Sequence, residues 1–269
     1  MSRLILIRHA QASFSPDPSR AFTDYDRLST LGVTQAEALG EELAAAGVTF
    51  DRVYAGPSER HRQTAEAVAR VYARRERQWP ELLTSEGLGE HEGAHVVRRA
   101  LEHPEYAEER SLLEAVLAGG AQGIDASGAG GERVGSAATG EAYATSARDH
   151  AHAYLKVFRR VTRRWARGEL PPALTTESWQ AFRARVEAGV RRILEESGRG
   201  ATVIAFTSGG PIGSTVAWAL GLGDEQALEL AWIVENATLT ELLYGEGRAS
   251  LKSFNVQPRL GQPELITHV

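Results

Sequence analysis

Apolar positions along this chain form short continuous runs that alternate with longer stretches of helical character. The runs are rich in large aliphatic and aromatic side chains, which is typical of buried strands. They span residues 3–8, 51–55 and 202–206. The helical stretches span residues 31–46, 57–73 and 177–196, and Thr34 is the predicted cap of the first. Because strands and helices alternate in this order, the pattern predicts an α/β protein with a parallel sheet.

The rest of the pattern predicts a helix that ends near Trp218, two late strands and a helical middle region. The late strands cover residues 239–244 and 251–255, with a turn near 245–247. The middle region has helical stretches at 94–118 and 141–167. Residues 119–140 between them are rich in Gly, Ala and Ser, which predicts a flexible loop.

Composition removes several classes of chemistry. The chain of 269 residues contains no cysteine, which excludes disulfides, thiolate metal sites and a cysteine nucleophile. Its formal net charge of −5 argues against nucleic acid as a partner, because nucleic-acid-binding proteins need a basic surface. The first apolar run is too short for a signal segment, and no stretch approaches the roughly 20 apolar residues of a membrane span. We therefore expect a cytoplasmic protein that binds neither nucleic acid nor membranes.

Polar side chains that can do chemistry follow the predicted strands. Arg8 and His9 come directly after the first strand. Ligands of open α/β sheets bind at the carboxyl ends of the strands, so this pair predicts an anion site that contains a nucleophile or proton carrier. Three further segments also contain polar side chains that can do chemistry. They are residues 58–65 after the second strand, residues 88–93, and residues 207–212 after the strand at 202–206.

In this order and spacing, the segments resemble the histidine phosphatase superfamily, which is phosphoglycerate-mutase-like. The resemblance rests on Arg8-His9 after a strand, Arg60 in an R-x-x-Q-T-A helix start, the Leu88-Gly89-Glu90 segment, and Ser208-Gly209-Gly210-Pro211-Ile212 after a strand. It covers roughly residues 1–95 and 180–260. It implies a three-layer α/β/α sandwich with a mixed, mostly parallel sheet. It also implies one domain over residues 1–269, with residues 94–175 as a helical insertion over the active site.

The resemblance also implies roles for individual side chains. Arg8 and Arg60 would clamp a phosphoryl group, and His9 would attack phosphorus to form a phosphohistidine. Glu90 would act as proton donor and then as base, with Glu86 and Glu92 as alternatives. Additional phosphate-binding groups would be Gln11, Ser208 and Gly209. The expected ligand is a small phosphorylated substrate, no metal or cofactor is required, and a homodimer stays open.

One position departs from the family pattern. The family usually has a second histidine just before the Gly-Gly of the last motif, and this chain has Ser208 there. A hydroxyl can donate a hydrogen bond to a phosphate oxygen but carries no charge. The helix that starts at this turn offers N–H groups to an anion, and Ser208 is also a natural N-cap. We therefore expect an active phosphatase with an altered site, and the alternative is an impaired protein that binds phosphate.

Residues 91–95 suggest a second interpretation of the function, because their sequence is His-Glu-Gly-Ala-His. On a helix, an H-E-x-x-H string places two histidines on one face for zinc, with Glu92 as general base, as in metalloproteases. Gly93 weakens the helix that this site needs, and no third ligand is evident. The arginines and the Gly-Gly turn would have no role in such an enzyme, so a phosphatase is the favoured interpretation.

Overall fold

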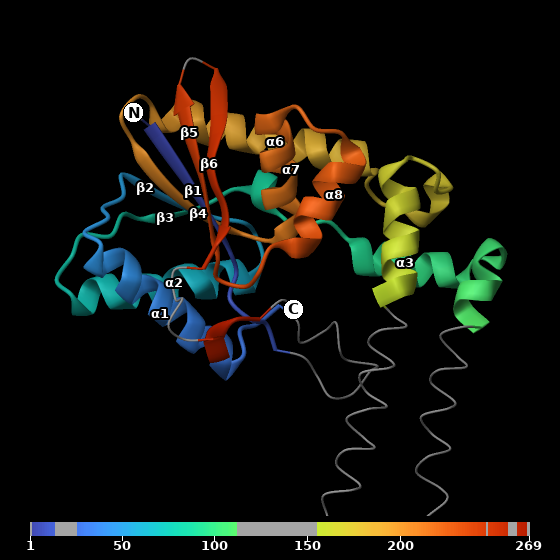
Figure 1. Ribbon diagram of the computed structural model, residues 1–269, viewed down its shortest axis with the longest axis horizontal. Helices are drawn as coiled ribbons and strands as arrows, with labels where there is room; N and C mark the ends of the chain where they lie inside the picture. The colour runs from blue at the N-terminus through green and yellow to red at the C-terminus, as the bar shows by residue number, and fades with distance from the viewer. Residues whose placement is uncertain (1, 14–25, 112–154, 246, 258–262, 268–269) are drawn as a thin grey trace, which may run out of the picture. The chain divides into compact units, whose positions relative to one another are not determined.

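The computed structural model describes residues 2–13, 26–111, 155–245, 247–257 and 263–267 (Figure 1). The chain divides into two compact units, which we describe separately. The first consists of residues 1–91 and 180–269, and the second of residues 92–179. Among the helices in the described ranges, none has the length and apolar character to cross a membrane.

The first unit is built on a mixed sheet of six strands in the order β3-β2-β4-β1-β5-β6. Their bounds are β1 Ser2–Arg8, β2 Arg52–Ala55, β3 Leu82–Thr84, β4 Thr202–Thr207, β5 Leu239–Gly245 and β6 Arg248–Val256. The strands from β3 to β1 pair in parallel, whereas β5 and β6 are antiparallel to their neighbours. The predicted mixed, mostly parallel sheet is therefore confirmed. The three-residue strand β3 was not predicted, because three residues are too few to show a pattern of apolar and polar positions.

Helices cover both faces of this sheet. On one face lie α1 (Thr30–Ala45) and α2 (Glu59–Arg74), and on the other lie α6 (Trp179–Ser197) and α7 (Gly209–Leu220) (Figure 1). Strand side chains alternate between the two layers, so Ile5 and Ile7 pack in the cluster formed with α1 and α2. Leu4 and Leu6 point the opposite way and are also fully buried. The three-layer α/β/α sandwich is therefore confirmed.

One prediction at a helix start needs correction, and one helix was missed. The cap of α1 is Ser29, whose hydroxyl accepts a hydrogen bond from the Gly32 N–H at 2.9 Å. Thr34 lies inside this helix and donates to the Thr30 carbonyl, so it is not the cap. The helix α8 (Asp224–Ile233), which packs against α7, was not predicted.

The regular secondary structure in the described part of the second unit is helical. It contains α3 (Gly93–Glu102), short 3-10 turns at Pro104–Tyr106 and Pro172–Leu174, and helical residues 107–111 and 155–166. A continuous helix over 94–118 was wrong, because His103 adopts an extended conformation before Pro104. The predicted loop at 119–140 lies outside the described residues. The predicted insertion at 94–175 falls within this unit, and its placement over an active site stays a prediction.

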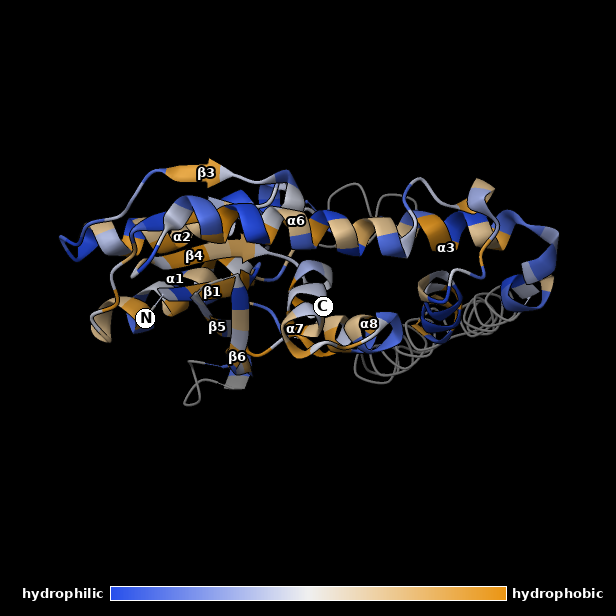
Figure 2. Ribbon diagram, turned by 90° about the horizontal axis from the view of Figure 1, so that it is seen from above, coloured by the Kyte–Doolittle hydropathy of each residue, from blue (hydrophilic) through white to orange (hydrophobic). Residues whose placement is uncertain are grey.

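Figure 2 shows how hydropathy follows this layering in the first unit. Apolar residues run along β3 and β4, whereas α2 and α6 carry both apolar and polar residues around their circumference. The buried side of α2 includes Thr64, Val68, Val71 and Tyr72, at the spacing of one helix face. The same face also contains His61, a polar residue at the first turn.

Candidate active site

The carboxyl ends of three parallel strands meet at one edge of the sheet. Arg8 of β1 is in register with Thr207 of β4, so the residues that follow each strand, His9 and Ser208, are neighbours. The His9 N–H donates to the Thr207 carbonyl at 2.7 Å. Gly56, which follows β2, donates its N–H to the Phe206 carbonyl at 2.9 Å. The parallel register therefore brings the predicted motifs together.

His9 is buried, and its ring is oriented by the backbone. Nδ1 lies 2.8 Å from the carbonyl oxygen of Ala10. A carbonyl can only accept, so Nδ1 carries the proton and the lone pair of the ring is on Nε2. The His9 carbonyl accepts a hydrogen bond at 3.0 Å from the side-chain amide of Asn236, a residue that the sequence analysis did not single out. The Ala10 contact gives the His9 ring a defined tautomer, and the Asn236 contact holds its backbone.

The electrostatic surroundings keep the His9 ring neutral. Burial, followed by the positive charges of Arg60 and Arg8, lowers the pKa of His9 well below its ordinary value of 6.5. The imidazole is therefore unprotonated near pH 7, which is the form that can act as a nucleophile.

Both predicted arginines are nearly buried at this edge of the sheet. Arg8 is 9% exposed, and its guanidinium donates to the Val234 carbonyl. Arg60, in the first turn of α2, is 8% exposed. Its Nη1 lies 3.0 Å from Oδ1 of Asp26, and its Nη2 lies 3.4 Å from the Ser208 hydroxyl. Asp26 was not predicted from the sequence, and its side chain also accepts a hydrogen bond from the Glu59 N–H at the start of α2.

The neighbouring Arg62 has a different environment. Its side chain is 47% exposed and forms ion pairs with Glu59 and Glu66 on the surface of α2. The structure thus brings Arg60 and Ser208 together and leaves Arg62 on the helix surface.

Ser208 occupies the N-cap position of α7, but its hydroxyl makes no capping hydrogen bond. Its Oγ instead lies 2.6 Å from Nε2 of His61. The imidazole of His61 has no exposed surface, and its centroid is 5.7 Å from that of His9. His61 was not predicted from the sequence, although its spacing from Thr64 and Val68 along α2 is that of one buried helix face.

The Glu90 side chain contacts the backbone at the N-terminus of α7. Its Oε2 accepts from the Gly210 N–H at 3.1 Å, and its Oε1 accepts from the His91 N–H at 2.9 Å. The Thr207 hydroxyl donates to the Leu88 carbonyl at 2.6 Å and so ties this segment to β4. The Glu90 carboxylate is therefore next to the backbone turn that contains Ser208.

The two alternative carboxylates have other surroundings. Glu86 is exposed in a 3-10 turn (Glu86–Leu88). Glu92 is exposed in the second unit, where it accepts a hydrogen bond from the Thr176 hydroxyl at 2.7 Å. Of the three carboxylates, Glu90 is the one that the structure places at the N-terminus of α7.

Gln11 and Gly209 have contacts that the sequence did not predict. Oε1 of Gln11 accepts a hydrogen bond from the Ser29 hydroxyl at 2.8 Å, which links it to the cap of α1. Gly209 packs against α8, where an added Cβ would stand 2.6 Å from the Ala231 carbonyl oxygen. Their part in phosphate binding stays a prediction.

The H-E-x-x-H string does not have the helical geometry that a zinc site needs. The helix α3 begins at Gly93, so His91 and Glu92 precede it and cannot share a helix face with His95. No group of three or more His, Cys, Asp or Glu side chains within the described ranges is placed to hold a metal ion.

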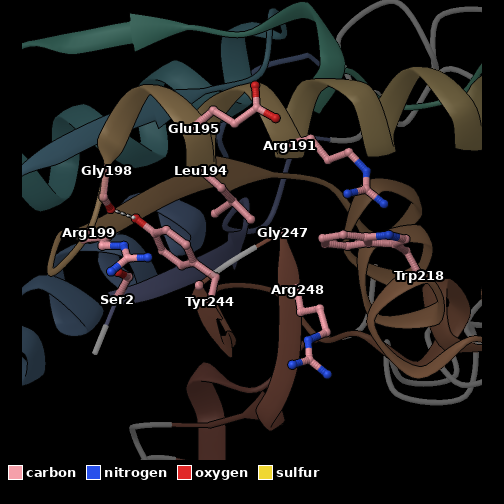
Figure 3. A pocket seen from close by; sticks show the side chains of 11 residues that line it. Ser2, Arg191, Leu194, Glu195, Gly198, Arg199, Trp218, Tyr244, Gly247 and Arg248 are labelled. Carbon is pink, nitrogen blue, oxygen red and sulfur yellow. Dashed lines mark hydrogen bonds between the residues drawn. The ribbon is translucent and has the colours of Figure 1, made fainter.

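A cavity of about 200 Å³ lies at the opposite end of β1 (Figure 3). Ser2 lines it, whereas His9 follows the last residue of the strand, roughly 23 Å away at 3.3 Å per residue. The Arg191 guanidinium lies 4.7 Å over the Trp218 ring in its wall and pairs with Glu187. This cavity is therefore separate from the residues around His9.

Comparisons with known proteins identify a matching family model and solved structures of similar fold. The family model described as Histidine phosphatase superfamily (branch 1) matches residues 4–121 and 137–257. No curated protein matches the chain.

Similar solved structures include three enzymes. Phosphoglycerate mutase from Bacillus anthracis has a TM-score of 0.54 and 19% identity, with 94% of this chain and 92% of that chain covered. Phosphoserine phosphatase from Entamoeba histolytica has a TM-score of 0.54 and 15% identity, with 96% and 98% covered. The mycobacterial glucosyl-3-phosphoglycerate phosphatase has a TM-score of 0.51 and 20% identity, with 95% and 99% covered. At these identities the likeness concerns the fold.

Proposed function

The chain belongs to the histidine phosphatase superfamily, and on this premise we propose that it hydrolyses phosphomonoesters through a phosphohistidine on His9. The observation that carries the proposal is the state of His9. Its ring is neutral, its proton is held on Nδ1 by the Ala10 carbonyl, and its lone pair is on Nε2. Arg8 and Arg60 are close enough for their charges to lower its pKa. A neutral nucleophile close to two cations suits attack on a phosphate dianion.

In the first half of the reaction, Nε2 of His9 attacks phosphorus and the bond from phosphorus to the ester oxygen breaks. Arg8 and Arg60 stabilise the negative charge of the phosphoryl oxygens. Glu90, in its protonated form, gives its proton to the leaving oxygen, so an alcohol departs and a phosphohistidine remains.

In the second half, water attacks the phosphohistidine. The Glu90 carboxylate takes a proton from the water, the bond between nitrogen and phosphorus breaks, and orthophosphate leaves. His9 and protonated Glu90 are thereby restored. Each step balances without an additional reactant.

The arginines supply the charge stabilisation that a metal ion provides in other phosphatases, so we propose a metal-independent reaction. The substrate class is a small phosphorylated molecule, with sugar phosphates, nucleotides and phosphorylated side chains as the candidates to screen. The helical second unit is the part expected to select among them, because the residues around His9 recognise only the phosphoryl group.

The test is turnover of a generic aryl phosphate by the wild-type protein and by His9→Ala, each with and without a chelator. We expect activity that disappears in His9→Ala, ignores the chelator, and accompanies a trapped phosphoryl group on His9. Arg62→Gln is the matched control, because this arginine pairs on the surface of α2. Turnover by His9→Ala at the wild-type rate would refute the mechanism. Binding of orthophosphate without turnover would indicate the impaired phosphate-binding alternative.

A further inference from the structure

His61 is a buried imidazole beside the one position at which the site departs from the family pattern. Its Nε2 is 2.6 Å from Ser208 Oγ. By the sequence resemblance, Ser208 stands where the family usually has its second histidine. The two residues are 147 positions apart in sequence and come from the start of α2 and the start of α7. An imidazole thus reaches this part of the site from a different element.

The space that the His61 ring occupies depends on the absence of a side chain at Gly56. A Cβ added at Gly56 would stand 2.5 Å from Nδ1 of His61, which is too close for any side chain. The same Cβ would stand 2.5 Å from the Leu88 carbonyl oxygen. The absence of a side chain at Gly56 therefore lets the ring lie between α2 and the segment that carries Glu90.

The hydrogen bonding of His61 is directed at Ser208. Among the described residues, Nδ1 makes no hydrogen bond of standard geometry and interacts with the Gly56 backbone, so the Nε2 contact is the ring's one hydrogen bond of standard geometry. A buried polar group costs free energy unless it is hydrogen-bonded, and an apolar side chain would fill this space at lower cost. The burial of an imidazole here is therefore explained by its contact with the Ser208 hydroxyl.

We propose that His61 and Ser208 together supply the hydrogen-bond donor that the family's second histidine supplies, with His61 as a positioning residue. With a phosphoryl group bound, His61 Nε2–H donates to Ser208 Oγ, and the Ser208 hydroxyl donates to a phosphoryl oxygen. Arg60 Nη2, 3.4 Å from the same Oγ, helps to orient it. This inference rests on the proposed function. It assigns His61 no direct contact with substrate, since its ring has no exposed surface.

The pairing predicts what single substitutions do. Without His61, the Ser208 hydroxyl loses the group that directs its proton toward the ligand, so His61→Ala should lower kcat/KM by about tenfold to thirtyfold, the effect of losing one to two buried hydrogen bonds. His61→Gln can place an amide N–H near Nε2 and should retain activity within about threefold of the wild type. Ser208→His should also lose activity, because the new ring would collide with His61.

The decisive variant is the double substitution His61→Ala with Ser208→His, which returns the imidazole to the turn before α7 and empties the space it needs. We expect it to recover at least tenfold over either single variant, a coupling that a double-mutant cycle measures directly. Loss of packing around α2 would not be repaired in this way. Arg62→Gln is the control, and circular dichroism checks the fold of each variant.

Two readouts separate this inference from the proposed function. The first is kcat and KM for an aryl phosphate, and the second is the dissociation constant of inorganic phosphate, which needs no turnover. Weaker phosphate binding by His61→Ala with recovery in the double variant supports the pairing, even if the wild type proves inactive. Wild-type behaviour of His61→Ala in both readouts overturns the inference. The inference is also overturned if the wild type binds no inorganic phosphate. It is likewise overturned if the double variant has no higher activity or phosphate affinity than the two single variants.

Discussion

Lowering the pH from 7.5 to 5.0 should destabilise this protein by about 2 kcal/mol through His61 alone. Burial, with a contribution from the charge of Arg60, lowers the pKa of His61 from 6.5 to about 3 in the folded protein. In the unfolded chain the same ring has its ordinary pKa of about 6.5. Between these two values the unfolded state binds one more proton than the folded state, so the stability decreases as the pH falls.

The magnitude follows from the linkage relation. Stability from this group is fully present above pH 6.5 and is lost progressively toward the folded pKa of about 3. Each pH unit below 6.5 costs about 1.4 kcal/mol, so 1.5 units between pH 6.5 and 5.0 give about 2 kcal/mol. His9, whose pKa is also lowered by burial and by the arginines, acts in the same direction.

The assay compares the free energy of unfolding of the wild type and of His61→Gln in urea at pH 7.5, 6.5, 5.5 and 5.0. Glutamine does not titrate in this range, so the difference between the two proteins reports the titration of His61, including its electrostatic effect on His9. We expect the wild type to lose about 2 kcal/mol more than the variant between pH 7.5 and 5.0. Parallel pH dependences for the two proteins would refute the reasoning, since His61 would then titrate alike in both states.

Three further predictions concern other residues. Glu90→Gln should lower kcat for an aryl phosphate by about 10² to 10⁴ with little change in KM, measured by steady-state kinetics, because an amide cannot transfer the proton; an unchanged kcat would contradict this. Asp26→Asn should tighten inorganic phosphate binding by up to about fivefold in calorimetry, because it removes a 52% exposed anion that competes for Arg60; weaker binding would show that Asp26 orients Arg60. Ile204→Ala should cost about 2–5 kcal/mol in urea unfolding, because Ile204 has no exposed surface and lies in the core beside α1 and α2; a loss below 1 kcal/mol would contradict the packing.

The strand ends illustrate how far sequence reasoning reached. The apolar runs around Ile5 and Ile204 identified β1 and β4, because a buried strand needs such a run. Parallel pairing of the two then made neighbours of His9 and Ser208, as the rule for α/β sheets predicts. The Q-T-A register also selected Arg60 over Arg62, and the structure places Arg60 next to Ser208.

The role of Ser208 illustrates where this reasoning stopped. A serine before Gly-Gly at a helix start is a natural N-cap, and the sequence predicted that role for Ser208 alongside phosphate binding. In the structure its hydroxyl contacts His61 and Arg60 and makes no capping bond. Local propensity could not predict this, because the competing partners lie on another helix.

By itself, the sequence determined the order of most strands and helices of the first unit, the family, and the edge of the sheet that carries His9. These features depend on the period of apolar residues and on short motifs, which are local properties of the chain. Only the tertiary structure decided that the Glu90 carboxylate contacts the N-terminus of α7 and that His61 forms a hydrogen bond with Ser208. Those contacts depend on how α2, β4 and the segment before Glu90 pack together, and packing joins residues that the sequence keeps more than a hundred positions apart.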